Sequence, residues 1–218
     1  MEVKMRFLSI LTLTLFIAAA LLPCILSAEE YRARGGTADD YTDSQDRVWY
    51  GAQKTDQDWG GWVETEPRTA ASGNLTDDAK TQAQEAGYDE VLFHAVSWAQ
   101  SPATIKFQFK TGNGFFDVTY LVGEHWSPNN RGFDIIIEDE VVEALYVTPG
   151  ADEIDIKTYN GIEVTDETLD FNFIGNAETG AGDLNPMFSA LEAIESADTA
   201  VDPKAKLTTT WGALKGNR

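Results

Sequence analysis

The chain is poor in cysteine, histidine and basic residues, and each shortage excludes a class of site. Its 218 residues include one cysteine, Cys24, and two histidines, His94 and His125. A single cysteine cannot close a disulfide within the chain, so a disulfide-stabilised scaffold is excluded. A zinc site would need both histidines together with carboxylates, and we do not favour one.

Basic residues are outnumbered by acidic ones, 16 Lys and Arg against 36 Asp and Glu, which gives a net charge of −20. Such a surface repels nucleic acid and anionic lipid at long range. It suits a neutral partner, a cation or solubility alone. We therefore expect no nucleic-acid partner.

Motifs of enzyme active sites are also missing. The sequence contains no Gly-rich phosphate loop, no nucleophile elbow and no His-x-x-x-His pair. Its many carboxylates give no distinct pair for glycoside hydrolysis. For Glu124 and Asp134 we favour a structural role, capping backbone amides or pairing with Arg131. The acidic group Asp152, Glu153 and Asp155 lacks the spacing of a known calcium loop. We expect no catalysis, cofactor or metal, with a glycan-processing enzyme as the alternative.

Residues 1–28 have the layout of a secretory signal peptide. Two basic residues precede an almost continuous apolar run over 7–26, and small residues follow it before Glu29. The run is also long enough for an uncleaved membrane anchor, and Cys24 allows a lipoprotein reading that Pro23 fits poorly. We predict a protein that is secreted or held in the cell envelope.

The remaining chain predicts an all-β domain over residues 29–197, an antiparallel β-sandwich. Apolar residues occupy every second position in several short runs, as in strands with one buried face: 104–110, 116–122, 133–137, 169–173 and 188–194. Clusters of Gly, Asn and Pro separate them and predict turns: 111–114, 127–130, 159–161 and 175–186. Only residues 77–86 have helical spacing, and residues 198–218 are expected to form a polar tail or linker.

Tryptophan is the informative residue type, with six in the chain, and few of them fall on the alternating positions. Trp126 borders a Ser-Pro-Asn-Asn turn, and Trp98 stands shortly before Pro102. The apolar face of a sugar ring stacks on a flat aromatic face, while its hydroxyls need carboxylates or amides. Loop tryptophans next to Asp and Asn are therefore typical of a sugar site, although a loop tryptophan can also cover the core.

The order of motifs resembles the malectin and malectin-like family of secreted carbohydrate-binding domains. The stretch "GFFDVTYLVGE", residues 114–124, resembles the family strand "G-x-Y-x-V-x-L-x-F-x-E", and "RGFDI", residues 131–135, resembles the "R-x-F-D-V" strand after it. The other matching segments, in chain order, are 31–36, 41–49, 183–186 and 190–195. The resemblance implies a jelly-roll-like, galactose-binding-like sandwich with a short helix.

The resemblance also implies a set of ligand-binding residues, namely Trp49, Trp98, His125, Trp126 and Asp183. Two departures stand out: Asp46 replaces a family glycine, and residues 57–89 have no counterpart that we can align. We expect a secreted, non-catalytic domain that stacks a neutral oligosaccharide or polysaccharide, glucan-like by preference, on loop aromatics. The alternative is a structural or adhesive cell-surface module that binds protein, with contact to a membrane only through an uncleaved N-terminal segment.

Overall fold

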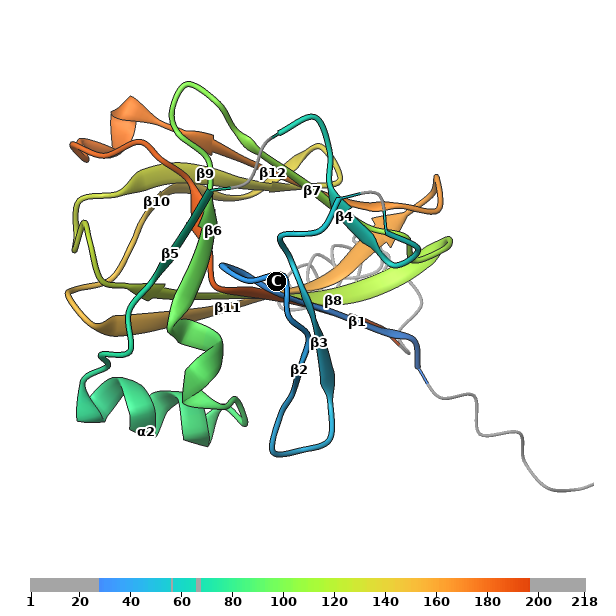
Figure 1. Ribbon diagram of the computed structural model, residues 1–218. Coiled ribbons are helices and arrows are strands. Elements are labelled where there is room, and N and C mark those ends of the chain that lie inside the picture. The colour runs from blue at the N-terminus through green and yellow to red at the C-terminus, as the bar shows by residue number, and fades with distance from the viewer. Residues whose placement is uncertain (1–27, 56, 66–67, 197–218) are drawn as a thin grey trace, which may run out of the picture.

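Two β-sheets packed face to face form the body of the molecule (Figure 1). The computed structural model describes residues 28–55, 57–65 and 68–196. The six-stranded sheet has the order β11 (Glu153–Val164), β8 (Gly114–Glu124), β14 (Ala190–Glu195), β1 (Glu30–Arg34), β3 (Val48–Gly51) and β2 (Tyr41–Thr42). The five-stranded sheet has the order β10 (Glu140–Val147), β9 (Gly132–Ile137), β12 (Leu169–Gly175), β7 (Ile105–Phe109) and β4 (Gly60–Trp62). The antiparallel sandwich predicted from the sequence is confirmed, and among the pairings between the strands of the described residues only β1 with β3 is parallel.

The main core lies between these sheets and is strongly aromatic. In β7 the residues Ile105, Phe107 and Phe109 are buried while the two between them are half-buried, which is the period of two expected for one core-facing side. Phe171 and Phe173 of β12 pair directly with Phe107 and Ile105. The alternation of apolar residues in the sequence thus correctly identifies which side chains of β7 face the core.

A second core lies on the outer side of the six-stranded sheet. Strand β8 is buried on both faces over its second half, where Leu121 points away from the main core. Helix α2 (Asp77–Glu85) and the 3-10 helix η1 (Glu90–Phe93) cover this face with apolar side chains that include Ala79, Ala83 and Phe93. The helix begins where predicted, and the Thr76 hydroxyl caps it by accepting from the Ala79 amide.

A small three-stranded sheet joins the two layers at one end of the sandwich (Figure 1). It consists of β13 (Met187–Phe188), β6 (Ala95–Trp98) and β5 (Arg68–Ala71). Trp98, the last residue of β6, faces Met187 on one side and Arg68 on the other in the strand register. This sheet therefore fixes one tryptophan at the end of the sandwich where loops from both layers meet.

One turn prediction is wrong. Residues 159–161 lie inside β11, where the pairing with β8 shifts register between Tyr159 and Ile162. Gly161 has φ +70°, so an Asn-Gly pair that often makes a hairpin turn makes a β-bulge here. The turn at residues 175–186 contains the 3-10 helix η2 (Ala177–Thr179).

The predicted signal segment and tail fall almost entirely outside the described residues, since only Ala28 of the first belongs to them. Within the described ranges, no helix has the length and apolar character needed to cross a membrane. In the same ranges, no group of three or more His, Cys, Asp or Glu side chains is arranged to hold a metal ion. The acidic residues Asp152 and Glu153 instead hydrogen-bond to His125 and to the Gly150 amide.

Candidate ligand-binding cleft

Two loops from opposite halves of the chain are joined at the end of the sandwich. One connects β8 to β9, and the other connects β12 to β13. The Gly132 amide donates to the Asp183 carbonyl at 2.8 Å, and the Asp183 amide donates to the Asn130 carbonyl at 2.9 Å. These bonds form an isolated parallel bridge between Arg131 and Asp183. Backbone pairing therefore holds in place the loops that carry Trp126 and Asp183.

The carboxylate of Glu124 organises the first of these loops from a fully buried position. Its Oε1 accepts from the amides of Trp126 and Ser127 at 2.8 and 2.9 Å, and its Oε2 accepts from Arg131 Nε at 3.1 Å and from the Thr148 hydroxyl at 2.9 Å. Burial alone raises the pKa of Glu124, but the amides of Ser127 and Trp126 and the charge of Arg131 outweigh it, so the pKa is lowered. The predicted structural role for Glu124, with Arg131 as partner, is confirmed.

Arg131 transmits this arrangement to the second loop. One of its terminal nitrogens lies 3.0 Å from a carboxylate oxygen of Asp183 and donates to the Asn185 carbonyl at 3.0 Å. The side chain of Arg131 is 7% exposed, and that of Asp183 is 21% exposed. Glu124, Arg131 and Asp183 thus form a chain of charge-assisted contacts that runs from the core to the surface.

Trp126 is the exposed element of the first loop, with 41% of its surface accessible. The neighbouring His125 ring meets it edge-on, with centroids 5.0 Å apart. The side chain of His125 is itself only 2% exposed, and its two ring nitrogens lie 2.8 Å from an Asp152 oxygen and 3.1 Å from the Phe93 carbonyl. His125 therefore supports Trp126 from behind and has little surface to offer a ligand.

A cleft of about 270 Å³ opens between the two loops and the three-stranded sheet. Trp98 and Trp126 both line it, together with Asp183, Arg131, Asn185 and Met187. Three of the five residues predicted as ligand-binding, Trp98, Trp126 and Asp183, thus share one cleft although 85 residues separate the first from the last. Its apolar floor comes from Val96 and Ala70.

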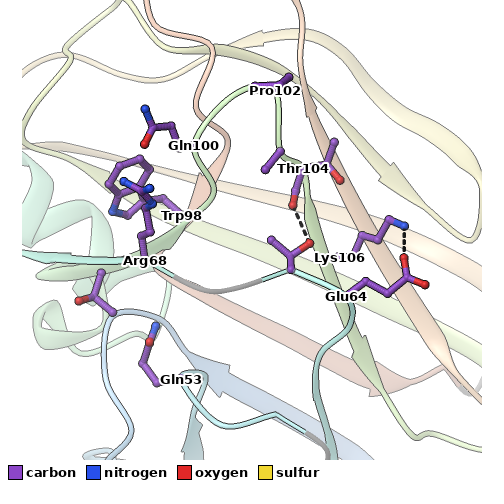
Figure 2. Close-up of a pocket in the computed structure, with 11 residues that line it drawn as sticks. Gln53, Glu64, Arg68, Trp98, Gln100, Pro102, Thr104 and Lys106 are labelled. Atoms are coloured by element: carbon purple, nitrogen blue, oxygen red, sulfur yellow. Dashed lines mark hydrogen bonds and ion pairs between the residues drawn. The ribbon is translucent and has the colours of Figure 1, made fainter.

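A larger hollow of about 930 Å³ adjoins this cleft, with Trp98 in the wall of both (Figure 2). The guanidinium of Arg68 lies over the Trp98 ring, 5.2 Å from its centroid. Figure 2 shows Trp98, Gln100 and Arg68 at one end of the hollow and the Lys106–Glu64 ion pair at the other. Sequence reasoning missed Arg68, since nothing in its local pattern distinguishes it from other surface arginines.

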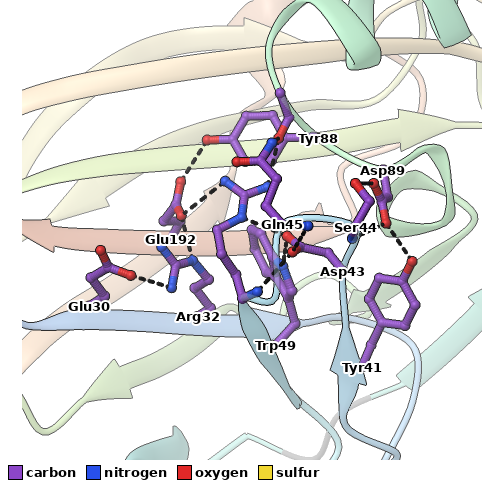
Figure 3. A network of polar contacts seen from close by, with 12 residues as sticks. Glu30, Arg32, Tyr41, Asp43, Ser44, Gln45, Trp49, Tyr88, Asp89 and Glu192 are labelled. Atoms are coloured by element: carbon purple, nitrogen blue, oxygen red, sulfur yellow. Dashed lines mark hydrogen bonds and ion pairs between the residues drawn. The ribbon is translucent and has the colours of Figure 1, made fainter.

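Trp49 lies elsewhere, and its predicted role as a ligand-stacking residue is wrong. Its side chain is 0% exposed and belongs to the second core. Its Nε1 donates to Asp43 at 2.9 Å, and the same carboxylate pairs with Arg47 at 2.6 Å. Figure 3 shows this network of polar contacts, in which Glu192 accepts from Arg32 and from Tyr88. Trp49 is therefore a structural residue and cannot contact a ligand.

The substitution of Asp46 for a family glycine also has a structural reading. Asp46 has φ +62°, in the left-handed region where glycine is favoured and where Asp and Asn are tolerated best among other residues. Its amide donates to the Asp43 carbonyl at 3.1 Å and closes the turn before β3. Aspartate thus keeps the same backbone turn at a modest cost in strain.

Comparison with known proteins gives matches at the level of structure alone. No protein-family model matches the sequence, and no curated protein matches it. Among solved structures, the extracellular domain of ANXUR1 from Arabidopsis thaliana superimposes with a TM-score of 0.64 at 13% identity, over 79% of this chain and 50% of that one. The ANXUR2 extracellular domain from the same plant gives 0.62 at 15% identity, over 79% and 50%.

The fold is malectin-like. A calcium-binding mutant of Bacteroides uniformis beta-glucuronidase 2 also matches, with a TM-score of 0.58 at 18% identity, over 77% of this chain and 18% of that one. The chain spans at most about half the length of the solved structures to which it is similar. The malectin-like fold implied by the motif order is confirmed. Because the sequence identities are low, the similarity applies to the fold alone.

Proposed function

We propose that this malectin-like domain binds a neutral carbohydrate without catalysis, in the cleft between Trp98 and Trp126. The observation that carries the proposal is the convergence of these two tryptophans with Asp183 from three separate segments. A partly exposed tryptophan face offers the flat apolar surface on which the C–H face of a sugar ring stacks. A glucan-like ligand, with equatorial hydroxyls around an apolar face, fits this chemistry best.

Asp183 supplies the polar rim of the proposed site. One of its oxygens accepts from the Asn185 amide at 2.9 Å and the other pairs with Arg131 at 3.0 Å. A carboxylate has about four acceptor positions, so two remain for the hydroxyls of a sugar. Arg131 orients this carboxylate through their ion pair, and a carboxylate forms short hydrogen bonds with hydroxyl donors. The role of Trp98, Trp126 and Asp183 as the binding set is part of the proposal.

The extracellular nature of the matched plant domains supports a location outside the cell or in its envelope. The signal layout of residues 1–28 points the same way. Neither nucleic acid nor an anionic lipid surface suits a net charge of −20. We therefore propose an exported carbohydrate-binding domain with no nucleic-acid partner.

A protein-binding role is the second candidate, and one surface favours it. Strand β10 forms an edge of the five-stranded sheet and exposes Val141, Leu145 and Val147. Exposed apolar side chains along an edge strand can bind a strand from another chain. One matched structure is of the plant peptide RALF23 in complex with FER and LLG2. A module of this kind would bind a protein partner through β10 and leave the cleft unused.

A glycan array followed by calorimetry tests the carbohydrate proposal. Trp126→Ala removes one stacking face from the cleft and is expected to weaken sugar binding by at least about 1 kcal/mol. Tyr50→Ala is the matched control, because Tyr50 is an aromatic residue with 37% exposure that does not line the cleft. Failure to bind any neutral glycan, or equal affinity in the two variants, refutes the proposed site. Binding of a protein that Val141→Asp abolishes would favour the second candidate.

A further inference from the structure

Three hollows lie one after another along one side of the sandwich. The tryptophan cleft and the hollow of about 930 Å³ share Trp98 as a common wall. The larger hollow and a third one of about 430 Å³ share Glu64 and Thr65. Ligand sites usually have volumes of about 300–1,000 Å³, so the middle hollow alone is at the upper end of that range. The shared lining residues make the three hollows neighbours on the surface.

The middle hollow has the chemistry of a surface for neutral polar ligands. Gln53, Gln100, Thr69 and Thr104 present amide and hydroxyl groups in its lining. Lys106 is paired with Glu64 at 2.5 Å, so this end of the hollow carries little net charge. Amides and hydroxyls both donate and accept, which matches the mixed donor and acceptor character of sugar hydroxyls.

Arg68 marks the junction between the cleft and the middle hollow. Its guanidinium lies over Trp98, and within the described residues it makes no ion pair with a carboxylate. Its donors are therefore available to oxygen atoms of a ligand that passes over Trp98.

The third hollow is bordered partly by backbone at two adjacent glycines, beside the side chains of Trp62, Glu64 and Gln108. Gly60 and Gly61 of β4 line it with φ values of +133° and +126°, which only glycine adopts readily. A Cβ atom at Gly60 would lie 2.1 Å from the Gln108 carbonyl oxygen. The two glycines thus let β4 approach β7 closely, and they leave this part of the border of the hollow without side chains.

We propose that the three hollows form one groove that binds an internal stretch of a linear neutral polysaccharide. This inference rests on the proposed function, and it extends the ligand from a single stacked unit to a chain of several units. One unit stacks between Trp98 and Trp126, Arg68 contacts the linkage above Trp98, and further units lie along the amide and hydroxyl lining toward Gly60. A site for a terminal sugar would need only the first cleft.

A ladder of oligosaccharide lengths tests the groove. Calorimetry would measure the affinity of the full chain for two series, maltose to maltohexaose and cellobiose to cellohexaose. In the series that binds, affinity is expected to rise at least about tenfold from the disaccharide to the hexasaccharide, which corresponds to about 1.4 kcal/mol. Equal affinity at all lengths overturns the groove and leaves the cleft intact. Absence of binding in both series and on the glycan array overturns the cleft and the groove together.

A blocking variant adds a second test that depends on position. Ala103 is exposed in the lining of the middle hollow, so Ala103→Trp is expected to fill part of the groove without disturbing the core. The matched control is Ala144→Trp, at an exposed position on β10 that borders none of the three hollows. Ala103→Trp should abolish the rise in affinity with oligosaccharide length and leave the affinity for the disaccharide unchanged. Ala144→Trp should change neither the rise in affinity nor the affinity for the disaccharide. Retention of the full gain in Ala103→Trp refutes the groove.

Discussion

Replacement of Glu124 by glutamine should destabilise the domain substantially, although the two side chains have the same shape. The carboxylate is 0% exposed and accepts four hydrogen bonds, from Trp126, Ser127, Arg131 and Thr148. The amide oxygen of glutamine can keep two of these bonds. Its NH2 group, however, would face a hydroxyl or guanidinium donor in place of an acceptor. Loss of the charge also removes the attraction to Arg131.

The magnitude follows from the contacts that remain. Breaking a buried ion pair typically costs about 3–5 kcal/mol, because an unpaired charge is left in a region of low polarity. Arg131 keeps its contact with Asp183 at 3.0 Å, so its charge is not left unpaired. We therefore expect Glu124→Gln to lower the free energy of unfolding by about 3 kcal/mol, a large part of the 5–15 kcal/mol typical of a domain.

Urea unfolding, followed by circular dichroism, measures this change. With a slope of about 1–3 kcal/mol per molar urea, the midpoint should fall by at least about 1 M. Glu64→Gln is the control, because Glu64 is an exposed carboxylate whose ion pair with Lys106 should contribute nothing measurable. A loss of unfolding free energy below about 1 kcal/mol in Glu124→Gln would show that the buried ion pair contributes no more to stability than a surface pair. That result would refute the expected role of Glu124.

The pH dependence supplies a second readout. The folded pKa of Glu124 lies below its ordinary value of 4.5, so the ionised carboxylate contributes its full stability above that pH. The contribution is lost as pH falls through the ordinary value toward the lower folded pKa. The difference in unfolding free energy between wild type and Glu124→Gln should therefore be constant near neutral pH and shrink below about pH 4.5. A difference that grows on acidification contradicts the assignment.

Two further predictions separate fold from binding. Trp49→Phe removes the Nε1 donor to Asp43 and should cost about 1–3 kcal/mol of stability in denaturant titrations. Its glycan affinity, measured by calorimetry, should stay unchanged. Weaker glycan binding by the fully folded variant would show that Trp49 belongs to the binding site. Gly60→Ala should lower the melting temperature by several degrees, because its φ is +133° and its Cβ would meet the Gln108 carbonyl at 2.1 Å, whereas Gly73→Ala, with nothing within 4 Å, should not lower it. Equal melting temperatures for the two alanine variants would contradict the close approach.

The sequence predicts the inner faces of the sandwich well, because a strand with one buried side has a period of two that is visible locally. The runs that became β7, β9 and β12 show this alternation. The second half of β8 does not, because helix α2 and η1 cover its outer face and bury Leu121 as well. Burial on two sides depends on a distant segment, and alternation within a strand contains no information about it.

The candidate site shows the same limit. Trp49 stands between Val48 and Tyr50, so three consecutive apolar residues leave no local alternation to show which side chain is buried, and the ligand role came from the resemblance. Trp49 is buried because helix α2 packs over the same face of the sheet, through Ala79 and Ala83. Trp98 and Trp126 were singled out as loop aromatics, and the structure places both in one cleft. Arg68 could not be found from sequence, because its importance comes from its position over Trp98 across a strand pair.

The setting of Trp126 argues against a role as a cover for the core. The tryptophans that fill the cores, Trp49 and Trp62, are 0% and 4% exposed, whereas Trp126 is 41% exposed. Its backbone is nevertheless fixed by Glu124, and its ring is supported edge-on by a buried His125. An exposed aromatic ring that is already immobilised loses little conformational entropy when a ligand stacks on it. The buried Glu124 carboxylate thus stabilises the domain and also fixes the backbone of an exposed aromatic residue, and a fixed, exposed ring is what a preorganised binding site needs.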